Sequence, residues 1–517
     1  MSTSTDQKRT DSGAVPSALS EGLALQKTPT KRGHVITEEE YPEVLGFHLS
    51  NWKKWTILTV IFLVQTSMNF NTSLYANGQA GIEKQFGVSH QESASGAAIF
   101  LILYAFGCEL WAPWSEEFGR RIVIQASLTL VNIFCLPVAL ASSFGAILAG
   151  RALGGLSTAG GSVTLGMVAD MFDSDSQGLP LAFIVLSSVG GSVLGPIVGG
   201  PVEAYLPWQW TIWIQLIFGV LVQVLHFVLV PETRSSVLLD RHAKKLRKTG
   251  EMTNAYGPNE LKTWREYLLP SDLIDLWLRP FRFFITEPIV SVLSLLSGFS
   301  DALIFMQIQS LGEVYAIWGF TTVQTGLAFI PFGIGYIMAF LIFIPIVKRN
   351  HLLRQRHPLN EYMQYERRLQ NLLWLAPCLP FGLILFAWTS LREAHWIGPM
   401  FGTVFIGIAN YAIYMATIDY MVAAYGPYSA SATGGNGFAR DCLAGILTWA
   451  AKPYYTAFTF EYGLPVANTV MAGISMLLVA ATVVIYKQGS QMRAKSPFAQ
   501  SLSRTRGTAG AAPADAI

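Results

Sequence analysis

Long apolar stretches alternate with short polar segments through most of the chain. A helix that crosses a bilayer needs about 20 mostly apolar residues, and twelve segments satisfy that requirement. They are residues 55–76, 95–113, 122–141, 146–171, 181–204, 210–230, 283–308, 323–347, 372–390, 396–424, 430–455 and 465–486. The pattern predicts an all-α membrane protein with twelve transmembrane helices.

One long polar segment separates the first six predicted spans from the last six. The division predicts a disordered cytosolic tail (1–53), an N-terminal six-helix bundle (54–231), a cytosolic central loop (232–280), a C-terminal six-helix bundle (281–487) and a second cytosolic tail (488–517). Two pseudo-symmetric bundles joined by a long loop are typical of transporters whose substrate path lies between related halves.

Basic residues indicate the orientation of the spans. With both termini in the cytosol, 30 of the 35 Lys and Arg residues fall in cytosolic segments and three fall outside. Cytosolic loops collect Lys and Arg, so we expect both termini on that side. The first fifty residues contain no apolar core before a cleavage site, so no cleaved signal peptide is expected.

Composition narrows the class of protein. Charged residues make up only 13% of the chain and the mean hydropathy is +0.39, which excludes an ordinary soluble protein. A net charge of +2 gives no concentrated basic face, so no nucleic-acid partner is expected. Cys108, Cys135, Cys378 and Cys442 are isolated in apolar surroundings, which predicts neither a disulfide framework nor a metal site.

Two short segments carry residues suited to conformational switching. The predicted turn after the second span reads LWAPWSEEFGRR, and a carboxylate with arginines at a helix end can hold one conformation closed on the cytosolic side. The fifth span reads GGSVLGPIVGG, in which small residues four apart form a smooth packing ridge and the proline bends the helix. The predicted conformational residues are Glu116, Gly119, Arg120, Arg121, Gly191, Gly195, Pro196, Gly199 and Gly200.

Charged residues inside the spans are candidates for energy coupling. The chain has no Gly-Lys dipeptide and therefore no phosphate-binding loop, so we expect an ion gradient as the driving force and no cofactor. Proton coupling needs a carboxylate that can gain and lose a proton. Glu109 and Asp301 are taken as the deepest carboxylates, and Arg151 is costly in an apolar helix. Glu109 is the first candidate because it shares a bundle with Arg151.

Polar and aromatic residues within the spans predict a substrate path. Gln65 and Asn69 lie on one helical stripe of the first span, and later spans contribute similar residues. Such a lining suits a large amphipathic ligand. The predicted path residues are Gln65, Asn69, Trp213, Gln215, Phe305, Gln307, Asn410, Tyr411 and Tyr414.

Several of these segments resemble a known family. The turn after the second span resembles the loop signature of the major facilitator superfamily, with Ala112 in place of its first glycine, and Arg151 with Gly155 resembles a second motif of that superfamily. The fifth span resembles the antiporter motif of its drug:proton antiporters. With VPETR after the sixth span and GNGFAR ending at Arg440, the chain resembles the fungal twelve-span drug:proton antiporters over about residues 50–498. In many members a proline and an apolar residue stand where this chain has Cys108 and Glu109.

The resemblance implies a proton-coupled exporter of drug-like or secondary-metabolite small molecules. It also implies a plasma-membrane protein, with the vacuolar membrane as the alternative, that acts as a monomer and is not an enzyme. A polyamine exporter and a proton-coupled nutrient symporter stay open as transport alternatives. A membrane sensor without transport is the alternative from another class, although the short tails do not favour it.

Overall fold

The computed structural model describes residues 34–158, 160–173, 176–260, 262, 273–357, 360–425, 429–458 and 462–496. Most of the two predicted disordered tails, residues 1–33 and 497–517, lies outside these described residues. Helices make up nearly all of the described chain.

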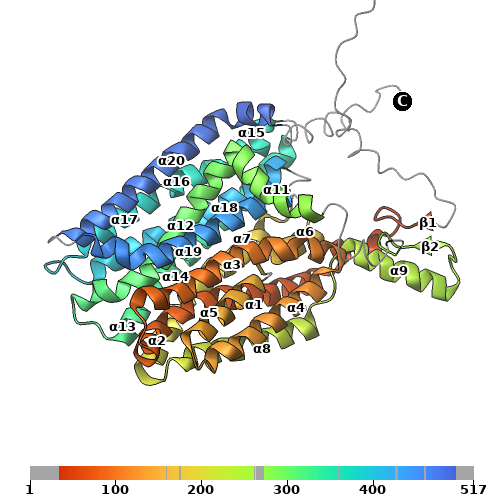
Figure 1. Cartoon of the computed structure of the whole chain (residues 1–517). Helices are drawn as coiled ribbons and strands as arrows, with labels where there is room; N and C mark the ends of the chain where they lie inside the picture. The colour runs from red at the N-terminus through yellow and green to blue at the C-terminus, as the bar shows by residue number, and fades with distance from the viewer. Residues whose placement is uncertain are drawn as a thin grey trace, which may run out of the picture.

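The N-terminal half contains six long helical segments, coloured red to yellow-green in Figure 1. A short 3-10 turn and α2 (Gln79–Phe86) continue the first helix on the outer side. The fourth segment is interrupted near residue 158, so it forms two helices. The six segments are α1 (Asn51–Leu74), α3 (His90–Glu117), α4 (Arg120–Ala139), α5 (Phe144–Leu156) with α6 (Gly160–Met171), α7 (Gly178–Tyr205) and α8 (Gln209–Leu229).

The C-terminal half repeats this arrangement beside the first, in green to blue (Figure 1). Its second and third segments are each interrupted, and α14 and α20 extend past the predicted spans. The segments are α12 (Pro288–Ala316), α13 (Thr322–Leu327) with α14 (Ile330–Arg356), α16 (Glu366–Leu375) with α17 (Cys378–Thr389), α18 (Ile397–Tyr425), α19 (Ser429–Thr456) and α20 (Gly463–Lys495).

Length and hydropathy agree with the predicted membrane fold. Ten helices of the described chain are long and apolar enough to cross a membrane, and α5 is a shorter apolar helix. The eleventh predicted span, α19, is long enough but carries Arg440, Asp441 and Lys452. Each of the twelve predicted spans therefore corresponds to a helix or an interrupted pair, and the fold is a multi-pass all-α membrane fold of two six-helix halves.

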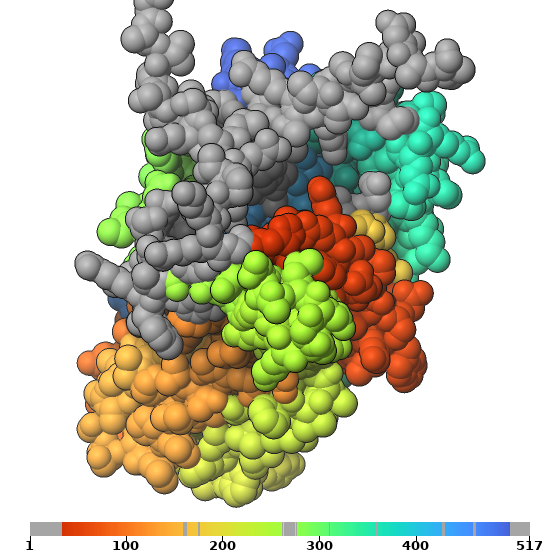
Figure 2. All heavy atoms as spheres, turned by 90° about the vertical axis from the view of Figure 1, so that its right-hand side faces the viewer, coloured from red at the N-terminus to blue at the C-terminus, as the bar shows by residue number. Residues whose placement is uncertain are grey.

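A small module projects from one end of the bundle, and we call that end the inner side. It contains α9 (Ser235–Thr249) and a two-stranded parallel sheet of β1 (His34–Val35) and β2 (Ala255–Tyr256) (Figure 1). Figure 2 looks onto this side, where α9 forms the bright green surface beside the red N-terminal residues. The amphipathic α11 (Leu273–Thr286) and the short α15 (Glu361–Gln364) belong to the same side.

The inner module corrects one expectation about the N-terminal tail. Residues 34–50 were expected to be disordered, but they form β1 and two 3-10 turns, Pro42–Val44 and Gly46–His48. Ile36 and Leu45 are buried against Leu239 and Leu246 of α9. The tail is ordered here because its few apolar residues cover the apolar face of a helix that would otherwise be exposed.

Candidate functional site

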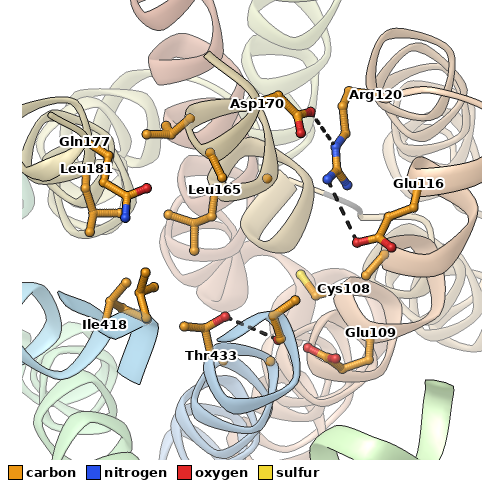
Figure 3. A pocket seen from close by; sticks show the side chains of 18 of the residues that line it. Cys108, Glu109, Glu116, Arg120, Leu165, Asp170, Gln177, Leu181, Ile418 and Thr433 are labelled. Atoms are coloured by element: carbon orange, nitrogen blue, oxygen red, sulfur yellow. Dashed lines mark hydrogen bonds and ion pairs between the residues drawn. The ribbon is translucent and has the colours of Figure 1, made fainter. Parts of the chain in front are cut away.

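A cavity of about 310 Å³ lies between the two halves. Its walls come from α3 and α6 of the first half and from α18 and α19 of the second (Figure 3). It extends from Glu109, in the body of α3, to Arg234, which directly precedes α9. The cavity therefore lies on the inner side of the bundle.

On the opposite, outer side the two halves meet closely. A Cβ atom built on Gly326 of α13 would lie 2.5 Å from the carbonyl oxygen of Pro196 in α7. A Cβ atom on Gly445 of α19 would lie 3.0 Å from the carbonyl oxygen of Ala98 in α3. Gln91 also donates a hydrogen bond of 2.7 Å from its amide to the carbonyl of Trp449. The structure is therefore hollow on the inner side and closed on the outer side.

Glu109 lies in the cavity wall at the boundary between the halves (Figure 3). The residue is only 7% exposed. Its carboxylate packs against α19 so closely that a Cβ atom on Gly434 would lie 2.5 Å from Oε2. Within the described part of the chain, no cation forms an ion pair with it. A buried carboxylate without a counter-charge is costly, which makes Glu109 a candidate for reversible protonation.

A cluster of charges in the second half faces the same cavity. Arg440 of α19 lies 3.1 Å from the Asp441 carboxylate and 3.7 Å from the Asp301 carboxylate of α12. Its guanidinium also lies 4.4 Å from the ring centre of Tyr414 and 3.5 Å from the hydroxyl oxygen of Ser188 in α7. Asp301 is therefore paired with a cation, unlike Glu109.

Asp301 and Tyr414 were predicted site residues, whereas Arg440 and Asp441 were not. The signal was present, because two adjacent charged residues inside an apolar segment are rare unless they face a polar interior. They follow a glycine-rich stretch, which lowers the mean hydropathy of the span, so the sequence did not show how deeply these two residues lie in it. The structure shows both side chains buried beside the cavity.

A second charge cluster lies at the inner mouth of the cavity. The Arg120 guanidinium donates a 3.0 Å hydrogen bond to Asp170 at the end of α6 (Figure 3). Arg234 lies 3.7 Å from the other oxygen of that carboxylate. Glu116 lies 3.9 Å from both Arg120 and Arg234. All of these residues belong to the first half and its link to α9, so the predicted loop residues are held within one half here.

Glu232 anchors this turn and was not among the predicted site residues. Its carboxylate accepts the backbone N–H groups of Arg120 and Arg121, at 2.9 and 3.2 Å, and those of Thr233 and Arg234, both at 3.0 Å. Gly119 adopts a φ of +100°, and a Cβ atom there would collide with the Glu232 carboxylate. Both observations explain why a glycine stands before the two arginines.

Comparison with known proteins identifies the family. Residues 59–449 match the Major Facilitator Superfamily. The chain belongs to this superfamily. It is 30% identical over 454 residues to the MFS-type transporter paaT of Penicillium rubens, covering 87% of this chain and 81% of that protein. It is 28% identical over 480 residues to the probable drug/proton antiporter YHK8 of Saccharomyces cerevisiae, covering 92% of each.

Solved structures agree on the fold. The xylose transporter XylE of E. coli, in a partially occluded inward open conformation, superimposes with a TM-score of 0.59 at 15% identity, covering 85% of this chain and 98% of that one. At this identity the likeness supports the fold alone. Together with the family match, it establishes a multi-pass major facilitator transporter.

The second half contains inner ion pairs that correspond to those of the first half. Arg120 begins the third helix and reaches Asp170 at the end of the fourth; Arg368 of α16 likewise pairs with Asp419 near the end of α18. Arg493 of α20 lies 2.5 Å from Glu366 and donates to the Tyr420 hydroxyl at 2.8 Å. Each of these ion pairs is therefore formed within one half.

The glycine ridge of α7 packs as its spacing indicates. Cβ atoms on Gly191 and Gly195 would lie 2.7 Å from the Thr66 carbonyl oxygen and against the Ser73 hydroxyl of α1. Gly199 faces Asn77, just beyond α1. Gly200 instead faces the second half, where a Cβ atom would lie 2.9 Å from the Thr322 carbonyl oxygen. One face of α7 therefore packs within its half, while Pro196 and Gly200 touch the other half.

Arg151 is buried inside the N-terminal bundle, as Glu109 is, but at a different depth. Its guanidinium donates to the Asn71 side chain at 2.8 Å and to the Gly96 carbonyl at 3.1 Å. It also lies 4.1 Å from the ring centre of Phe100. Gly96 precedes Glu109 by thirteen residues in α3, a rise of about 20 Å. Arg151 therefore braces the outer part of the first half and is separated from Glu109.

Three of the predicted path residues form hydrogen bonds between helices near the middle of the bundle. The Gln65 amide lies 3.4 Å from both the Tyr104 and Ser188 hydroxyl oxygens. The Asn410 amide donates to the Ser300 hydroxyl at 3.1 Å, and the Tyr411 hydroxyl donates to the Ala182 carbonyl of the other half at 2.8 Å. Of the nine predicted path residues, Tyr414 alone is among the residues that line the inner cavity.

The remaining predicted path residues have other surroundings. Phe305 packs between the halves against Leu101 and Ala444. Asn69 bonds to its own helix at the Gln65 carbonyl, and Gln307 is buried without a hydrogen-bond partner among the described residues. Trp213 packs against an apolar cluster inside the first half that includes Tyr75 and Ile212, and Gln215 donates a hydrogen bond to the Ser67 carbonyl there. Trp213 and Gln215 therefore lie away from the inner cavity.

Proposed function

We propose that this transporter exports amphipathic, drug-like or secondary-metabolite small molecules in exchange for protons. The observation that carries the proposal is the buried, unpaired carboxylate of Glu109, which lines the inner cavity and touches Gly434 of the opposite half. A proton bound there removes the cost of burying a charge when the halves close on the inner side. The printed name of the yeast relative, a probable drug/proton antiporter, supports the same function.

The remaining machinery fits an alternating-access cycle. Substrate enters the inner cavity from the cytosol, the inner ends of the halves approach each other, and the glycine contacts of the outer side separate. The cavity wall is apolar on α6 and α18, at Leu165, Val168, Ile418 and Val422, and polar on α3 and α19. This division suits a ligand with one apolar and one polar part.

The proposal includes the setting of the protein. We expect it to act as a monomer in the plasma membrane, with both termini in the cytosol and the proton gradient in place of any cofactor. The excess of basic residues on the α9 side supports this orientation.

Export of polyamines or other organic cations is the second candidate. The unpaired Glu109 carboxylate favours it, because a cationic ligand could supply the missing counter-charge. Arg440 on the opposite wall adds no net positive charge against such a ligand, because it is paired with Asp441 and Asp301.

Glu109→Gln tests the proposal in reconstituted vesicles. Substrate efflux by the original protein should rise with an imposed inward proton gradient, whereas the variant should lose that dependence and keep its expression level and folded yield. Glu313→Gln is the control, because it removes an exposed carboxylate from α12 outside the cavity. Unchanged transport and an unchanged pH profile in Glu109→Gln would contradict proton coupling at this residue.

A cell assay tests the direction of transport. Cells with and without the protein are compared for accumulation of a compound panel that includes polyamines, at two external pH values. Lower accumulation of at least one amphipathic compound is expected when the protein is present. Equal accumulation of every compound would remove the export hypothesis, and higher accumulation would indicate an uptake symporter.

A further inference from the structure

A second pocket lies outside the transport path, on the inner side of the C-terminal half. It has a volume of about 250 Å³ and is formed by the inner part of α14 and one face of α16. Its polar wall contains Arg349, Asn350 and Arg367, and its apolar wall contains Ile346 and Trp374. None of these residues lines the cavity between the halves.

The pocket carries positive charge that neighbouring acids do not neutralise. In the part of the chain that the structure describes, neither Arg349 nor Arg367 forms an ion pair. The nearby acids are already occupied, since Glu366 pairs with Arg493 and Asp419 pairs with Arg368. Among the described residues, the Arg367 guanidinium donates a hydrogen bond only to the Asn350 side chain, at 3.3 Å. Two guanidinium groups are therefore free to bind an anion.

The polar and apolar walls of the pocket lie at different depths along the membrane normal. α14 runs toward the inner side, so Ile346 lies deeper in the membrane than Arg349. α16 runs the opposite way, so Trp374 lies about 10 Å deeper than Arg367. Trp374 is 77% exposed, and exposed tryptophans favour the boundary between headgroups and acyl chains.

We propose that this pocket binds the phosphate of an anionic phospholipid in the cytosolic leaflet. Arg349 and Arg367 would bind the phosphate oxygens, because guanidinium groups match phosphate geometry with paired hydrogen bonds. Ile346 and Trp374 would contact the glycerol and the first part of an acyl chain. Phosphate is the shared chemistry of lipids and soluble phosphate esters, and the apolar wall favours the lipid.

The location connects the lipid site to the rest of the transporter. Asn350 and Asn371 line this pocket and also a smaller inner one that contains the Arg368–Asp419 pair. That smaller pocket is also bordered by Gly178, at the start of α7 in the other half. A bound headgroup would therefore lie one layer of side chains from the inner junction of the halves.

The test measures lipid binding to the full-length protein in detergent after removal of copurified lipid. Dioleoyl phosphatidic acid is titrated by native mass spectrometry, with dioleoyl phosphatidylcholine and inorganic phosphate as separate probes. Phosphatidic acid should bind in preference to phosphatidylcholine. Arg349→Gln with Arg367→Gln should weaken its binding roughly 30-fold, since each basic residue near a membrane contributes about a fivefold factor.

A charge-matched variant serves as the control. Lys348→Gln with Arg356→Gln removes two positive charges from the inner end of α14 but none from the pocket lining, so it should bind phosphatidic acid almost as the original protein does. If the Arg349 and Arg367 double variant does not fold, Arg349→Gln alone is informative, because that exposed side chain has no ion pair to lose within the described residues. It should bind about fivefold more weakly.

Three outcomes would overturn the proposal. The first is equal binding of phosphatidic acid by the original protein and the pocket variants, and the second is an equal loss in the pocket and control variants. The third concerns the source of the phosphate: if inorganic phosphate displaces the lipid with comparable affinity and Trp374→Ala changes nothing, the pocket is a soluble-phosphate site. A selective loss of lipid binding in Trp374→Ala supports the membrane assignment.

Discussion

The outer contact between the halves predicts how one methyl group should shift the conformational equilibrium. Gly326 of α13 touches the backbone of α7, and an added Cβ atom would lie 2.5 Å from the Pro196 carbonyl oxygen and 3.1 Å from the Gly200 Cα atom. Backbone atoms cannot relieve this clash by a change of rotamer, as a flexible side chain can. Gly326→Ala should therefore be incompatible with the closed outer side and compatible with the open one.

The size of the shift in the conformational equilibrium follows from the free-energy cost of overpacking. An extra methyl group in a close-packed contact costs about 1–3 kcal/mol, and that cost applies only to the state in which the contact exists. The equilibrium should thus move toward the outward-open state by roughly 5- to 150-fold. Transport should slow, because the protein would less often present its cavity to the inner side.

Distance measurements check this expectation directly. Spin labels at Lys84 of α2 and Arg392, both exposed on the outer side, report the separation of the halves in a variant whose four cysteines are replaced by serine. Gly326→Ala should lengthen the main distance. Gly333→Ala is the matched control, because its Cβ atom would meet Val193 of the other half at an ordinary 3.9 Å. Identical distance distributions for the two variants would refute the reasoning.

Three further predictions concern charged groups. Glu232→Ala should lower thermal stability by about 3 kcal/mol, because four backbone N–H groups lose their acceptor; a melting curve in detergent that matches the original protein would contradict this. Arg440→Gln should destabilise the protein by about 3–5 kcal/mol by stranding buried carboxylates, and adding Asp441→Asn should restore part of the loss, whereas a further loss would argue against the pairing. Burial alone would raise the pKa of Glu260, but its hydrogen bond to the Arg247 guanidinium holds that pKa below the usual value. This stabilisation of the inner module is present at neutral pH and lost as the pH falls below about 4, so proteolysis after β1 should increase there. Arg247→Ala lacks this stabilisation and should therefore be cleaved more readily already at neutral pH.

Long apolar stretches predict the spans well, because a helix that crosses the lipid needs apolar side chains over about 20 consecutive residues. The interruption near residue 158 left no such signal, because its small residues carry no charge and the apolar stretch continues on both sides. The order of residues 34–50 was also hidden. It depends on Ile36 and Leu45 meeting α9, which is about 200 residues away in the chain.

Side-chain partners were harder to predict than helices. Apolar context placed Arg151 and Glu109 in one bundle but could not give their depth, and the structure separates them along α3. A helical stripe shows which residues share a face, but it does not show whether that face meets the other half. Gln215 therefore turned out to bond inside the first half, while Tyr414 reached the cavity.

The distribution of charge suggests why Glu109 is the group to which the conformational change should respond. Arg120 pairs with Asp170 in the first half, and Arg440 pairs with Asp301 in the second, so the halves can move apart or together without separating either pair. The outer contacts involve neutral backbone and side-chain amide groups. Glu109 differs because its carboxylate has no ion-pair partner among the residues that the structure describes, and it touches the opposite half at Gly434. Adding or removing one proton there changes the free energy of closing the inner side, whereas a proton elsewhere must first displace an existing partner.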